Sequence, residues 1–147
     1  MSERQGHLIE TSSGVAELLR SVKSVAVLGI KTEAQAGQPA HYVPAYCQRA
    51  GLEVIPVPVY YPDVKAILGR PVYRTLAAIE RDVDLVNVFR RPEDIDQHVD
   101  DIVAKRPRAV WFQSGIRNDA AARHLARAGI DVVQDRCLMV ELQRVGR

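Results

Sequence analysis

Short apolar runs alternate with segments of helical length along almost the whole of this chain, and this alternation limits the folds that it can adopt. The runs are continuous and rich in β-branched residues, which is typical of strands covered on both faces. They span residues 24–30, 52–59, 84–89, 109–113 and 130–134. Strands joined by helices form right-handed crossovers and a parallel sheet. We therefore predict an α/β protein with a Rossmann-like, doubly wound parallel sheet of about five strands in three αβα layers.

Helix signals stand between these runs. Ser12 or Ser13 can cap a first helix, Pro39 suits the first turn of a second, and Gly51 ends that second helix. Asn118 is the expected cap of a later helix. The predicted helices after the first are 40–51, 75–80, 91–106, 118–129 and 135–145. Because open parallel sheets bind ligands beyond the carboxyl ends of their strands, at the switch point, the loops there are the candidate functional segments.

Composition is that of one globular domain. The chain has 147 residues, of which 47% are hydrophobic, 26% charged and 5% aromatic. We expect residues 1–11 to be an N-terminal tail and residues 12–147 a single domain. The 20 Lys and Arg residues nearly balance the 18 Asp and Glu residues, so we expect no nucleic-acid partner. The chain lacks both an apolar run of the roughly 18 residues that span a bilayer and the order of a secretory signal, so we expect a cytoplasmic protein with no membrane partner.

The sequence contains no complete catalytic or metal-binding pattern. Cys47 and Cys137 are far apart and form no CxxC, so we expect reduced thiols and no zinc site. Cys137 stands near the start of the last predicted helix, for which Asp135 is the expected cap. There it is either a stabilised thiolate or, as the favoured alternative, a small buried residue. Ser114 lacks the flanking G-x-S-x-G of a nucleophile elbow, and the histidines form no triad pattern. We expect a binding protein without a complete active site.

The loop after the first strand has the features of a phosphate site. Gly29 stands at the strand exit, Lys31 lies in the loop, and a helix begins near 39–41, where backbone N–H groups and the helix dipole favour phosphate or pyrophosphate. The spacing is not that of a dinucleotide fingerprint, because the next glycine, Gly37, comes eight residues after Gly29.

Two further loops extend this candidate site. The second strand ends Val57-Pro58-Val59, without the acidic residue that holds the ribose of NAD, which argues against NAD. This apolar edge either lies against an adenine or carries prolines that only block the strand edge. In the segment 88–94 (VFRRPED), Arg90 and Arg91 can pair with phosphates, although adjacent side chains point apart and we expect one of them to face the ligand. The alternative is an ion pair with Glu93 or Asp94.

Taken in order, the segments VAVLGI, QPAHYVPAYCQRAGLEVIPV, VNVFRRPE, AVWFQSGIRN and VVQDRCLMVE resemble the stand-alone CoA-binding domain family, from about Val22 to Val145. That family is similar in fold to the N-terminal CoA-binding domain of the succinyl-CoA synthetase α subunit. The resemblance implies coenzyme A as the ligand, with its diphosphate over the first loop, its adenosine against 57–59 and 88–92, and its pantetheine arm along 113–115. The residues assigned to the CoA site are Gly29, Ile30, Lys31, Gln38, Pro39, Ala40, His41, Val57, Pro58, Val59, Phe89, Arg90, Arg91, Pro92, Gln113, Ser114 and Gly115.

The chain departs from the family pattern in two loops. The family shows Asn-Pro and a basic residue after the second strand, where this chain has Pro58, Val59 and Tyr60, so the 3′-phosphate lacks that cation unless Lys65 or Arg91 replaces it. Glu33 is unfavourable beside phosphates unless it points to solvent.

The sequence thus favours a small protein that binds CoA or an acyl-CoA and is a monomer or homodimer. Without the phosphohistidine domain of the synthetase, we expect no acyl-CoA ligation by the chain alone. The alternatives are an NAD(P)-binding redox module, and a subunit that presents CoA to a separate ligase or acyltransferase.

Overall fold

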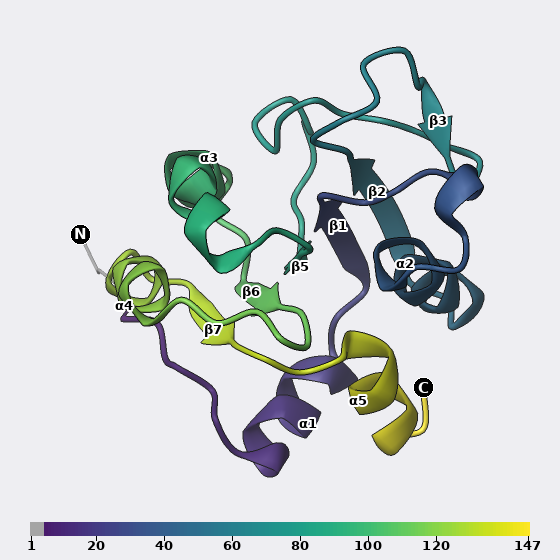
Figure 1. Cartoon of the computed structure of the whole chain (residues 1–147). Helices are drawn as coiled ribbons and strands as arrows, with labels where there is room; N and C mark the ends of the chain where they lie inside the picture. Colours follow the sequence, from purple (N-terminus) through teal and green to yellow (C-terminus); the bar gives the residue numbers. More distant parts are fainter. Residues whose placement is uncertain (1–4) are drawn as a thin grey trace.

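The computed structural model describes residues 5–147, and its centre is a parallel five-stranded sheet (Figure 1). The strands are β1 (Ser24–Leu28), β2 (Glu53–Val57), β5 (Leu85–Val88), β6 (Ala109–Phe112) and β7 (Asp131–Val133). Their order is β2-β1-β5-β6-β7, and every neighbouring pair is parallel. The predicted Rossmann-like α/β fold is confirmed. The direction of winding reverses between β1 and β5, which makes that gap the switch point of the sheet.

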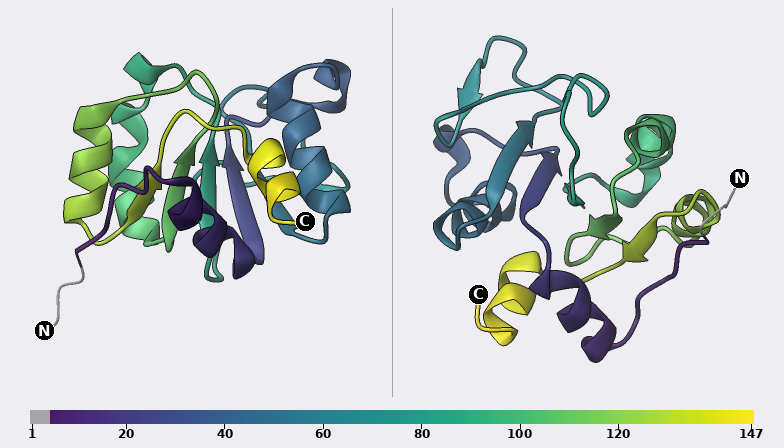
Figure 2. Two further views of the ribbon diagram at one scale, coloured as in Figure 1. Left: turned by 90° about the horizontal axis from the view of Figure 1, so that it is seen from below. Right: turned by 180° about the vertical axis from the view of Figure 1, so that it is seen from behind.

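Helices cover both faces of the sheet (Figure 2). One core lies between the sheet and α1 (Ser12–Arg20), α2 (Pro39–Arg49) and α5 (Leu138–Arg144). The other lies against α3 (Val99–Lys105) and α4 (Asp119–Arg127). Every residue of β1, β5 and β6 is buried, as the continuous apolar runs predict for strands between two helix layers.

Two of the predicted caps are wrong. Thr11, rather than Ser12 or Ser13, caps α1, because its hydroxyl accepts the Gly14 N–H at 3.1 Å. Asp135 does not cap α5, whose N-cap is Cys137. Asp135 instead adopts a φ of 56° and accepts the Gly115 N–H at 2.6 Å, which joins two loops. Asn118 caps α4 as predicted, accepting the N–H of the residue three positions later at 3.0 Å.

The connection from β2 to β5 contains no helix at 75–80, which corrects that prediction. The Asp101 side chain accepts two backbone N–H groups of this segment, those of Leu76 and Ala77, at 2.7 and 3.0 Å. A segment this short cannot form a stable helix by itself, so these contacts decide its shape. The connection also forms a two-stranded hairpin, β3 (Ala66–Ile67) and β4 (Arg70–Pro71).

The segment 91–106 is also divided rather than one helix. It begins with two 3₁₀ turns, η2 (Pro92–Asp94) and η3 (Asp96–His98), and becomes α-helical only in α3. The turns bring the side chains of Asp94 and His98 next to the loop that follows β5, where they contact arginines.

Both edges of the sheet are occupied. The Tyr73 N–H donates to the carbonyl of Pro56 on β2 at 2.9 Å, and Pro56 itself has no N–H to offer a neighbour. Along β7, Val132 donates to His7 O at 2.9 Å and accepts the Ile9 N–H at 2.8 Å. The first four residues of the predicted tail lie outside the described residues. Within residues 5–147, no helix is long and apolar enough to cross a bilayer. The contacts of Tyr73 with β2 and of residues 7–9 with β7 protect these two edge strands from pairing with another chain.

Gly29 supports a direct test of the close approach at the switch point. Its φ is 89°, its N–H donates to Val57 O at 2.9 Å, and a Cβ built on it would overlap Phe89 O. We predict that Gly29→Ala lowers the free energy of unfolding by at least about 2 kcal/mol, through backbone strain and overpacking. Chemical denaturation measures this. Gly37→Ala is the control, because a Cβ there meets nothing within 4 Å, and its effect should stay within about 0.5 kcal/mol. Equal effects of the two substitutions would contradict this account.

Candidate functional site

The loops after β1, β2, β5 and β6 lie at one rim of the sheet. These four loops are the candidate segments predicted from the sequence. Hydrogen bonds continue the strand ladder to the first loop residues: Phe89 N donates to Leu28 O at 2.9 Å and Gln113 N donates to Val88 O at 3.3 Å. Together with the bond from Gly29 to Val57, these contacts place the exits of all four strands side by side over the switch point.

The β1–α2 loop supplies the cation of Lys31 to this rim. Lys31 is half-buried, and its ammonium donates to the side-chain oxygen of Gln38, the N-cap of α2. The helix start offers fewer N–H donors than the sequence suggests. Pro39 has none, and the N–H groups of His41 and Tyr42 donate to Gln38 O at 2.9 and 3.0 Å. The loop therefore attracts an anion mainly through the Lys31 charge and the dipole of α2.

Glu33 is exposed and is paired with two neighbours. Its carboxylate accepts from the buried His41 Nε2 at 3.1 Å and from the Leu68 N–H at 2.8 Å, so it links α2 to the β3–β4 hairpin. Burial acts to raise the pKa of Glu33, but the hydrogen bonds from Leu68 and His41 outweigh it and hold that pKa below its usual range. The unfavourable charge is thus compensated. Ile30 and Ala40 are buried beneath the loop.

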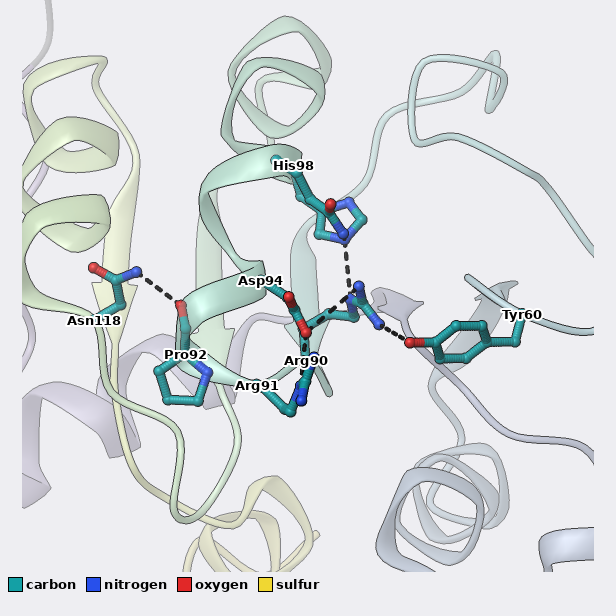
Figure 3. A network of polar contacts seen from close by, with 8 residues as sticks. Tyr60, Arg90, Arg91, Pro92, Asp94, His98 and Asn118 are labelled. Atoms are coloured by element: carbon teal, nitrogen blue, oxygen red, sulfur yellow. Dashed lines mark hydrogen bonds and ion pairs between the residues drawn. The ribbon is translucent and has the colours of Figure 1, made fainter.

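The β5–η2 loop turns its two arginines in opposite directions (Figure 3). Arg90 is 8% exposed and lies between Tyr60 and His98: its Nη1 donates to the Tyr60 hydroxyl at 3.2 Å and its Nε to His98 Nε2 at 3.1 Å. Arg91 is exposed, and its Nε donates to Asp94 at 2.8 Å. The ion pair considered as an alternative in the sequence therefore exists for Arg91 and, at 3.9 Å, for Arg90, and the Arg91 hydrogen bond lowers the pKa of Asp94.

Tyr60 belongs to this site although the sequence reasoning did not assign it. The guanidinium carbon of Arg90 lies 5.4 Å from the centre of its ring, a cation–π contact, and Tyr60 as a whole is 59% exposed. It follows directly on the predicted adenine edge, where Pro58 is buried and Val59 half-buried. The signal available in the sequence was an aromatic residue directly after the predicted second strand.

The floor under the β6 exit is polar and buried. Gln113 is 3% exposed, and its Oε1 accepts from Asn87 Nδ2 at 3.2 Å and from the Leu138 N–H at 3.3 Å. Asn87 Oδ1 is a buried side-chain oxygen without a hydrogen-bond partner among residues 5–147. Gln113 thus supports the rim from below, whereas Ser114 and Gly115 are exposed on it.

Pro92 and Phe89 complete the rim on the β5 side. Pro92 O accepts from Asn118 Nδ2 at 3.0 Å, which joins this loop to the start of α4 (Figure 3). Phe89 is half-buried against the core under α2.

The two cysteines are free thiols and differ in burial. Cys47 is fully buried, and burial raises its pKa to about 12, so this thiol stays protonated. Cys137 is half-buried at the start of α5, between the two environments predicted for it. In the described part of the chain, no group of three or more His, Cys, Asp and Glu residues is placed to hold a metal ion.

The fold and this rim define a Rossmann-like α/β domain with a cationic switch-point site. The chain belongs to the CoA binding domain family, whose model matches residues 23–143. It is 31% identical to the uncharacterized protein YneT of Bacillus subtilis over 126 residues, which are 86% of this chain and 90% of that one. A solved structure from Thermus thermophilus is 37% identical, with a TM-score of 0.83, and the match covers 92% of this chain and 99% of that one.

The fold also occurs inside a larger enzyme. The dinucleotide forming acetyl-coenzyme A synthetase 1 of Ca. Korarchaeum cryptofilum matches with a TM-score of 0.66 and 15% identity, over 80% of this chain and 27% of that one. At this identity the match shows a shared fold.

His98 supports a prediction about pH. Burial and the nearby Arg90 lower its pKa below the ordinary 6.5, and the Arg90 hydrogen bond requires an unprotonated Nε2. The unfolded chain therefore binds more protons than the folded protein below about pH 6.5, so the free energy of unfolding falls as the pH falls. We predict that His98→Gln, which keeps a hydrogen-bond acceptor, flattens this dependence between about pH 7 and pH 5. Denaturation at several pH values measures it, and the same slope in both proteins would refute the assignment.

Proposed function

We propose that this protein binds coenzyme A or an acyl-CoA at the rim over the switch point and has no catalytic residues of its own. The observation that carries the proposal is the pair of cationic side chains, Lys31 and Arg90, on the loops that flank the gap between β1 and β5. Membership of the CoA binding domain family supports the same ligand. A diphosphate bound across this gap would contact a cation on each side and the positive end of the α2 dipole.

The adenosine would lie next to the diphosphate, over the end of β2. Val57 and Pro58 are buried and Val59 is half-buried there, whereas the exposed ring of Tyr60 offers a surface on which a base can stack. Arg91 is exposed on the β5–η2 loop and is our candidate for binding the 3′-phosphate. Its bond to Asp94 uses only Nε, so its remaining donors suit a second anion.

An NAD(P)-binding role is the less favoured candidate. The β2 strand ends without a carboxylate that could hold ribose hydroxyls, since Val57 is followed by Pro58 and Val59. A role as a CoA-presenting subunit of a separate ligase or acyltransferase requires the same site and is compatible with the proposal.

Isothermal titration calorimetry with CoA, 3′-dephospho-CoA, NAD, NADP and ATP tests the ligand. CoA should bind tightest, with 3′-dephospho-CoA weaker because Arg91 loses its anion. Tighter binding of NAD or NADP would overturn the proposal.

Lys31→Ala tests the diphosphate site. We expect it to weaken CoA binding about ten-fold, which corresponds to about 1.4 kcal/mol for one contact to a charged group. Lys23→Ala is the matched control, because Lys23 is exposed at the opposite, amino end of β1, and it should leave CoA affinity unchanged. An equal effect of the two substitutions would reject Lys31 as a ligand of the diphosphate.

A further inference from the structure

A second hollow lies beyond the β6 and β7 ends of the same rim. This cleft of about 450 Å³ is lined on one side by Ser114 and Arg117 after β6, and on the other by Arg136 and Cys137 after β7. Leu8 and Val132 contribute an apolar wall. Ser114 belongs both to this cleft and to the rim proposed for CoA, so the cleft continues that site toward the outer strand.

The walls of the cleft are held rigidly by hydrogen bonds between the two loops. Asp135 accepts the Gly115 N–H at 2.6 Å, Gln134 accepts the Asn118 N–H at 2.8 Å, and the carbonyl of Arg136 accepts from the Trp111 indole at 2.7 Å. Because these contacts join the two walls, the cleft has its shape before any ligand binds.

Arginines and acids line the cleft in equal number, the acids being Glu10, Asp135 and Glu141. Arg117, Arg136 and Arg144 all line it, and a guanidinium group carries five N–H donors. Glu141 is 6% exposed and already pairs through one oxygen with Arg144 at 2.8 Å and through the other with Arg136 at 3.8 Å.

Arg117 uses its Nε on Asp119 at 3.0 Å, and its side chain is 56% exposed. Asp135 is engaged by the Gly115 N–H, and Glu10 is an exposed residue of the lining. Arg136 is held by Glu141 and by Glu10 O at 2.9 Å, whereas Arg117 and Arg144 each use one nitrogen in the ion pairs given above. The other N–H groups of Arg117 and Arg144 suit a ligand that accepts hydrogen bonds, such as a carboxylate.

The strand order indicates which part of an acyl-CoA would reach this cleft. With the adenosine over β2 and the diphosphate between β1 and β5, the arm can continue along the rim only over β6 toward β7, because β2 is the other edge of the sheet. We propose that the cleft receives the acyl group of a bound acyl-CoA and selects acyl groups that end in a carboxylate. This inference rests on the proposed function and adds the class of acyl group.

Calorimetry with glutaryl-CoA, pentanoyl-CoA and CoA tests the inference, because the first two have acyl chains of five carbons and differ in the terminal carboxylate. We expect glutaryl-CoA to bind about ten-fold tighter than pentanoyl-CoA, the effect of one charge-assisted pair. Equal affinities for glutaryl- and pentanoyl-CoA, with CoA still bound, would overturn the acyl selection and leave the proposed function standing. If none of the three bound, the proposed function would be wrong, and this inference with it.

Variants assign the selection to the cleft. Arg117→Gln and Arg144→Gln should each reduce the preference for glutaryl-CoA to three-fold or less, while their affinity for CoA stays that of the unaltered protein. Arg127→Gln is the control, since Arg127 is an exposed residue in the last turn of α4, and it should keep the full preference. Melting temperatures verify that all three variants fold. An undiminished preference in both cleft variants would show that other residues bind the carboxylate and would refute the site.

Discussion

The close approach of three chain segments at the carboxyl end of β1 is the constraint on which the functional rim depends. Gly29 donates to Val57 O on one side and lies against Phe89 O on the other, so the chain leaves β1 with no room for a side chain. Because of this contact, the loops after β1, β2 and β5 begin at the same height above the sheet. In the proposed function, a ligand that spans the switch point would have Lys31 on one side and Arg90 on the other, although these residues are far apart in the chain.

Side chains, rather than helices, hold much of the structure around the rim. Asp101 accepts two backbone N–H groups of the segment 75–80, and Glu33 joins the β3–β4 hairpin to α2. Gln113 bridges Asn87 and the N–H at the start of α5 inside the core. A buried acceptor such as Gln113 Oε1 is costly unless its partners are present, so it fixes a particular position of its loop. The proposed site is accordingly built on hydrogen-bonded loops, with Lys31 half-buried and Arg90 buried beside it.

The charge of the molecule has a local pattern that its net value of +2 hides. The acids near the rim are bound by neighbours: Glu33 by His41, and Asp94 by Arg91. Farther along, Glu141 is enclosed by Arg136 and Arg144. Because these ion pairs engage only some of the N–H groups of each guanidinium, the remaining donors suit the anions proposed above. This arrangement links the proposed diphosphate contacts to the cleft beyond β7.

The sequence by itself determined the fold class, the five strands and the position of the candidate loops, because continuous apolar runs between helical segments have few solutions other than a covered parallel sheet. It also indicated Asn118 as a helix cap and set Arg90 apart from Arg91 through the alternation of an extended chain. Only the tertiary structure decided the contacts between distant segments: that Asp101 accepts N–H groups of the segment 75–80, that Glu33 joins the β3–β4 hairpin to α2, and that Tyr60 stacks on Arg90. Local patterns report local propensity, whereas these outcomes depend on partners brought together by the strand order, which no short stretch of sequence contains.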